Sequence, residues 1–128
     1  MNSTNGLKNR LKIMPSKQVL LKTIADLEPV LTGHGIGEKR VLLFQMEYSS
    51  PITQIAQTYL KSGDIVEGHC HPTMDEHFVF QRGKCEVTVE GEKLHCEGGQ
   101  YLLIPAGFQH QIEIITDTVM LTVGVALD

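Results

Sequence analysis

Residues 63–83 read GDIVEGHCHPTMDEHFVFQRG, and this stretch decides both the fold and the candidate site. His69 and His71 are separated by one residue, so in a β-strand their side chains point to the same face. Cys70 lies between them and points to the opposite face. We expect Cys70 to be a buried small hydrophobe rather than a nucleophile.

The residues after this pair predict that the chain turns back. Pro72 has no backbone N–H, so it should end the strand in a turn. The segment 76–80 then predicts a returning strand, and the resulting hairpin would carry Glu76 beside the two imidazoles. A second stretch, GQYLLIPAGFQH at 99–110, ends in another histidine. Imidazoles and a carboxylate suit a divalent transition metal. The expected ligands are His69, His71, Glu76 and His110.

The two stretches resemble the two motifs of the cupin superfamily. The first motif, G-x5-H-x-H-x4-E-x6-G, is filled by Gly63, His69, His71, Glu76 and Gly83. The second motif, G-x5-P-x-G-x2-H-x3-N, is met by Gly99, Pro105, Gly107 and His110, with Ile114 in place of Asn. The resemblance implies an all-β fold, the cupin double-stranded β-helix or jelly-roll barrel. It also implies one small barrel that binds a metal.

Alternation of apolar and polar residues predicts further strands on both sides of the motifs. We expect a hairpin turn at Gly83-Lys84, after which Cys85, Val87 and Val89 point inward. Short strands separated by glycine turns are typical of an all-β barrel or jelly roll. The strands expected outside the first motif are 40–46, 52–61, 85–90, 93–96, 101–104, 110–114 and 118–125.

The chain is expected to contain one domain, 17–128, preceded by a flexible segment, 1–16. The segment from Ser16 to Leu31 fits either a short helix capped by Ser16 or a strand at 19–24. We favour the strand. Residues 32–37 predict a glycine-rich loop, in which His34 is expected to be solvated rather than a ligand.

Charge and hydropathy exclude several kinds of partner. The formal net charge of −4 argues against nucleic acid or an anionic membrane as the main partner. No apolar run reaches the roughly 20 residues that a membrane span needs, and the N-terminus lacks an apolar signal-peptide core. The three cysteines are odd in number, which suits reduced thiols. We therefore expect a cytoplasmic protein.

The expected site suits one accessible metal ion per chain. A single histidine is commonly a core residue satisfied by hydrogen bonds, but an ionised Glu76 among three imidazoles would cost several kcal/mol without a cation. The set contains no cysteine, unlike most structural zinc sites. About two positions of an octahedral ion stay open. The ion is expected to be Fe, Mn, Zn or Ni, with Glu76 as a catalytic base if it binds loosely.

Several other residues are candidates for the substrate pocket. Strand alternation turns His77 away from the metal. Phe78 and Phe80 share the face of Glu76 and should form an apolar wall. Hydrogen-bonding candidates come from the neighbouring strands. The full set of pocket candidates is Gln57, Tyr59, Phe78, Phe80 and Tyr101.

Three functional hypotheses follow, because the cupin barrel hosts many activities. We favour a metalloenzyme that acts on a small oxygen-rich metabolite, a sugar or hydroxy acid, by metal-assisted proton transfer or isomerisation. The alternatives are an Fe(II)-dependent dioxygenase and a non-catalytic cupin that binds or senses a small ligand. A dioxygenase that uses 2-oxoglutarate would need a cationic anchor for the carboxylate of this cosubstrate. Arg40 and Arg82 are the few inner-region arginines that could supply it. A homodimer is expected, since open strand edges need cover.

Overall fold

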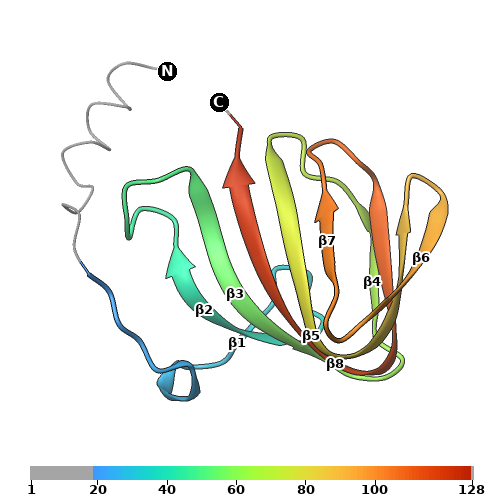
Figure 1. Cartoon of the computed structure of the whole chain (residues 1–128), viewed down its shortest axis with the longest axis horizontal. Coiled ribbons are helices and arrows are strands. Elements are labelled where there is room, and N and C mark those ends of the chain that lie inside the picture. The colour runs from blue at the N-terminus through green and yellow to red at the C-terminus, as the bar shows by residue number, and fades with distance from the viewer. Residues whose placement is uncertain (1–18, 128) are drawn as a thin grey trace.

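The computed structural model describes residues 19–127, and nearly all its regular structure is β-strand (Figure 1). A short 3-10 helix, η1 (Ile24–Asp26), precedes the strands. The strands are β1 (Val30–Leu31), β2 (Glu38–Phe44), β3 (Ile52–Leu60), β4 (Ile65–His69), β5 (Met74–Val89), β6 (Glu92–Glu97), β7 (Tyr101–Ile104) and β8 (His110–Ala126). All strand pairs are antiparallel. The all-β prediction is confirmed.

The two longest strands, β5 and β8, each belong to two layers. The first half of β8 pairs with β4 and with the second half of β5. The second half of β8 pairs with β3 and with the first half of β5. One layer therefore runs β1-β2-β3-β8-β5-β7, and the other contains β4, β8, β5 and β6. The strands curl at the bends of β5 and β8, which gives the jelly-roll barrel (Figure 1).

The prediction of a hairpin turn at Gly83-Lys84 is wrong. Strand β5 continues through both residues and bends there instead, with register shifts against β8 between Phe80 and Cys85. Gly83 has φ +95°, and a Cβ at this position would collide with the carbonyl oxygen of Asp117. The glycine is needed for a close approach of two bent strands. The segments 110–114 and 118–125 are likewise parts of one strand, β8.

The core lies between the layers and follows the predicted alternation. Cys85 and Val87 are buried, as are Ile112 and Ile114 on β8. Burial of each large apolar side chain stabilises the fold by about 1.5–3 kcal/mol. The largest fully buried side chains are Phe80, Ile104, Ile114, Met120, Val87, Thr118 and Cys85.

The N-terminal part of the described chain differs from the prediction. No strand forms at 19–24; this segment is irregular and leads into η1. It is held by a side chain, because Lys22 Nζ donates to Leu42 O at 2.7 Å and pairs with Glu47. The predicted flexible segment 1–16 lies outside the described residues. No helix in the part of the chain that the structure describes is long and apolar enough to cross a membrane.

Candidate metal centre

The four expected ligands meet between the two layers. His69 ends β4, His71 lies in the connection after it, Glu76 lies in β5, and His110 begins β8. One ligand atom from each residue can be chosen such that all four atoms lie within 4.8 Å of one another. These residues could therefore hold one metal ion.

Glu76 reaches the imidazoles by a different route from the predicted hairpin. Strands β4 and β5 do not pair; β4 pairs with β8, where His69 lies opposite His110. The part of β5 that carries Glu76 belongs to the facing layer. The connection between β4 and β5 thus crosses from one layer to the other, and the carboxylate approaches the histidines across the interior. Cys70 lies in this connection and is exposed, so its predicted burial is wrong.

Backbone carbonyls orient two of the imidazoles. His69 Nδ1 lies 2.9 Å from Glu67 O, and His110 Nδ1 lies 3.1 Å from Phe108 O. A carbonyl oxygen only accepts, so each Nδ1 carries the proton in these contacts. The Nε2 lone pair of a neutral ring is then left for a metal, and such partners commonly orient metal-ligating histidines.

The surroundings of Glu76 indicate that a cation fits among the four ligands. Its Oε1 is buried and has no hydrogen-bond partner among the described residues. The same oxygen lies 3.3 Å from Nε2 of both His71 and His110, so the imidazoles are near but not aligned for hydrogen bonding. A buried carboxylate oxygen without a partner is costly. A shared cation would satisfy the oxygen and the ring nitrogens together.

The pKa values describe the charges around this carboxylate. Burial alone would raise the pKa of Glu76, but the nearby His110, His71 and His69 together hold it below its ordinary value. Burial opposes protonation of His110, yet Glu76 and the Phe108 carbonyl raise the pKa of this imidazole. The pKa of His69 is lowered, mainly by burial. The Glu76 carboxylate and a protonated His110 thus favour each other's charged forms.

The ligands open into a cavity of about 380 Å³. This volume is in the range of small-molecule sites. Phe78 lines the cavity as predicted, whereas Phe80 is buried in the core and does not line it. The other lining residues include apolar Val66, Ile112 and Met120 and polar Lys39, Gln54, Thr58 and Thr122.

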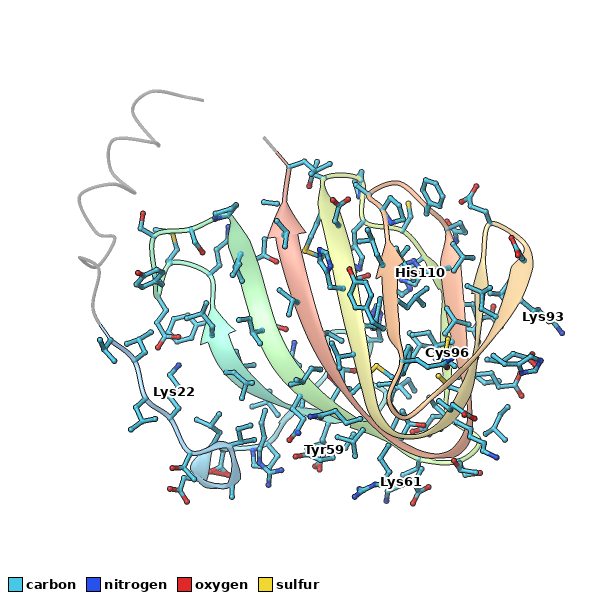
Figure 2. All side chains as sticks on the ribbon, viewed as in Figure 1. Lys22, Tyr59, Lys61, Lys93, Cys96 and His110 are labelled. Carbon is cyan, nitrogen blue, oxygen red and sulfur yellow. The ribbon has the colours of Figure 1, made fainter. Side chains whose placement is uncertain are left out.

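Three further predicted pocket residues, Gln57, Tyr59 and Tyr101, also lie outside this cavity. The inward face of β3 carries Gln54, Thr58 and Leu60, so Gln57 and Tyr59 point the other way. A period of two gives two faces, and only the pairing with neighbouring strands decides which is inside. Figure 2 shows Tyr59 at the lower edge of the molecule, far from His110.

Contacts on the outer face hold two of these residues, Tyr59 and Tyr101. Arg40 Nη1 donates to the Tyr59 hydroxyl at 2.8 Å, so the arginine also points away from the cavity. The Tyr101 hydroxyl lies 2.6 Å from His77 Nδ1. His77 is thus turned away from the candidate metal centre.

The sequence interpretation missed two polar residues that line the cavity. The His34 ring lies with its centroid 4.3 Å from that of His69, although its loop was expected to be solvated. Lys39 lines the cavity because β2 begins at Glu38 rather than at the expected residue 40. Residues 39–44 read KRVLLF and do not alternate, so no local pattern marks Lys39 as inward-facing.

The comparisons with known proteins agree with the fold. The Cupin domain family matches residues 57–125, so the chain belongs to the cupins. A curated relative, the polyketide synthase CurC of Streptomyces cyaneus, is 25% identical over 81 residues, 63% of this chain. The chain spans about half of that relative, since the match covers 53% of its length.

Solved structures share the same architecture at low sequence identity. A predicted oxalate decarboxylase from Thermotoga maritima superposes with a TM-score of 0.77 and 20% identity, covering 84% of this chain and 100% of that chain. Ectoine synthase from P. lautus has a TM-score of 0.74 and 16% identity, covering 86% of this chain and 80% of that chain. At these identities, the similarity establishes the fold alone.

Proposed function

We propose that this cupin is a metalloenzyme that acts on a small oxygen-rich metabolite by metal-assisted proton transfer or isomerisation. One observation carries the proposal: the buried Glu76 oxygen without a partner, which faces imidazole nitrogens at the end of a cavity. The ligand set contains no thiolate, and it leaves coordination positions toward the cavity. Structural zinc sites are tetrahedral and usually include cysteine, whereas four ligands on an octahedral ion would leave about two positions open.

Each part of the site has a role in such a reaction. A bound divalent ion supplies Lewis acidity toward substrate oxygens. His69 and His110 hold their Nε2 atoms in place through their backbone contacts. Glu76 has a lowered pKa, so it is ionised near neutral pH, and if it binds the ion loosely it can accept a proton from a substrate carbon or hydroxyl. Phe78, Ile112 and Met120 restrict the water near it.

The names of similar proteins support an enzyme rather than a storage protein. The two solved structures above are named as a predicted decarboxylase and a synthase. They share the barrel, so they indicate only that barrels of this shape serve small-molecule chemistry. A panel of candidate substrates is needed to identify the substrate of this chain.

The test begins with the metal and then measures turnover. Elemental analysis of purified protein should find about one transition metal ion per chain. A double variant, H69A/H71A, should lose it, whereas H77Q should keep it because His77 contacts Tyr101 on the outer face. Stoichiometric metal in the double variant would refute the site.

The metal-loaded protein is then assayed against a panel of sugars, hydroxy acids and diols. Solvent deuterium should enter a carbon-bound position of the substrate if proton transfer occurs. The variant E76Q should lower this exchange by about 100-fold or more, as expected for loss of a general base. Binding of panel members without exchange or conversion would favour the ligand-sensing alternative. Oxygen consumption coupled to turnover would favour the dioxygenase.

A further inference from the structure

Lys39 brings a positive charge into the cavity from the side of β2. It pairs with Thr58 on β3, which pairs in turn with Met120 on β8. All three residues line the cavity, so the row faces inward. Lys39 Nζ donates to Gln54 Oε1 at 3.1 Å, and Gln54 also lines the cavity. One of the three ammonium donors is used in this contact.

With a divalent ion bound, the cavity would be positively charged, although the whole chain is negatively charged. Among the described residues that line it, Lys39 is the only lysine or arginine, and Glu76 is the only carboxylate. A divalent ion exceeds the charge of Glu76 by one, and Lys39 adds a further positive charge. The formal net charge of the chain is −4. The loaded cavity therefore favours an anion.

Lys39 forms no salt bridge with Glu76. Their strands, β2 and β5, are separated by β3 and β8 in the layer. Three strand spacings correspond to roughly 14 Å between the backbones. Within residues 19–127, no ion pair joins Lys39 to a carboxylate. The two ends of the cavity thus carry separate binding groups, with room for a ligand between them.

We propose that the cavity binds a small molecule with metal-binding oxygens at one end and a carboxylate at the other, and that Lys39 binds this carboxylate. The inference rests on the proposed metal centre and adds the substrate class. A carboxylate fits better than a phosphate monoester, because Lys39 offers one positive charge and a phosphate carries about −1.5 to −2. Gln54 holds the ammonium from the side, which limits its motion.

The test compares two ligands that differ only at the distal end. 2-Hydroxyglutarate and 2-hydroxypentanoate share the same five-carbon chain and the same metal-binding hydroxy acid, but only the first has a second carboxylate. Calorimetric titration of the Co(II)-loaded protein gives both dissociation constants. We expect wild type to prefer 2-hydroxyglutarate by about tenfold or more, as for a charge-assisted hydrogen bond.

Variants at Lys39 test whether this residue causes the preference for 2-hydroxyglutarate. K39M keeps the length of the side chain without its charge and should abolish the preference, whereas K39R should retain most of it. K61M removes a lysine outside the cavity (Figure 2) and should leave the preference unchanged. Thermal unfolding and Co(II) affinity should be the same in K39M and wild type, which shows that neither the fold nor the metal centre is affected.

The outcomes separate this inference from the proposed function. If the wild type binds Co(II) but does not distinguish the two ligands, or if K39M keeps the preference, the role of Lys39 is wrong and the metal centre stands. If the wild type fails to bind Co(II), the proposed function itself is wrong, and the ligand class fails with it.

Discussion

At Glu76 and His110, a proton and the proposed metal ion would compete for the same atoms. The pKa of His110 is raised above its ordinary value by Glu76, so the ring is protonated over a wider pH range than a free imidazole. A metal ligand must be deprotonated, and binding therefore releases this proton. Metal affinity should be highest above the raised pKa of His110. Metal affinity should be lost as the pH falls through this raised pKa.

This competition predicts that the pH midpoint at which metal affinity is lost differs between E76Q and wild type. Removal of the carboxylate charge removes the main cause that raises the pKa of His110, so the midpoint of affinity loss should move to lower pH. Chelator competition from about pH 5 to pH 9 gives the midpoint independently of the weaker affinity expected for the variant. The H77Q protein should behave as wild type. A midpoint that is unchanged in E76Q would mean that the two residues are not coupled.

The three cysteines should differ sharply in reactivity. Cys70 is exposed, whereas Cys85 and Cys96 are buried opposite each other on β5 and β6. Burial raises the pKa of Cys85 to about 12 and also raises that of Cys96. Because the thiolate is the reactive form, a thiol reagent at about pH 8 should label Cys70 alone in the native protein.

Mass spectrometry of the labelled protein identifies the modified thiol. One rapid modification is expected in wild type and none in C70S, and all three cysteines should react in denaturant. Rapid labelling of Cys85 in C70S would show that β5 and β6 separate readily.

At the scale of the elements, the bend of β5 depends on Gly83. Its φ of +95° disfavours any side chain, and a Cβ would also collide with Asp117 and Thr118. Both costs should appear in G83A, with a loss of about 3 kcal/mol or more in the free energy of unfolding. Gly91 is a matched control, because its φ is +83° but nothing lies within 4 Å of a Cβ there.

The comparison of the two glycines isolates the contact between β5 and β8. G91A carries only the backbone cost and should lose about 1 kcal/mol. Urea denaturation of both variants measures the difference. Equal losses would mean that β8 can move away from β5 at the bend without penalty.

At the scale of the whole molecule, the layer that carries β7 exposes apolar side chains on its outer face. Val79 is 39% exposed, and Tyr101 and Leu103 are 59% and 42% exposed. Val79 lies directly opposite Tyr101 on the paired strands, so the exposed groups are adjacent. We propose that a second copy of the chain covers this face, since a contiguous apolar patch commonly marks an interface.

Light scattering at micromolar concentration tests the dimer. Wild type should have twice the mass of one chain, and L103D should be a monomer with an unchanged cavity. Ile65 is a control of similar exposure, 40%, on the other layer, and I65D should stay dimeric. A monomeric wild type, or equal dissociation by both substitutions, would contradict this interface.

Much of the fold could be predicted from residue spacing. A strand has a side-chain period of two, and this period predicted that His69 and His71 point to one side. Strand β4 ends at His69, so His71 reaches the same centre from the connection that follows the strand. The alternation at Cys85 and Val87 predicts a half-buried strand for the same reason, and both are buried. The family motifs then named Glu76 and His110 as the remaining ligands, and the fold brings them together with the histidines.

Tertiary structure decided what periodicity leaves open. An alternating pattern defines two faces but not which one is interior, so Tyr59 and Gln57 were assigned to the wrong side of β3. It also does not distinguish a turn at Gly83 from a bend, because that depends on where β8 continues its pairing. Lys39 and His34 come to line the cavity only when β2 pairs with β3 and brings the loop before β2 beside His69. Such contacts depend on pairing between strands that are distant in sequence, and local spacing carries no information about that pairing.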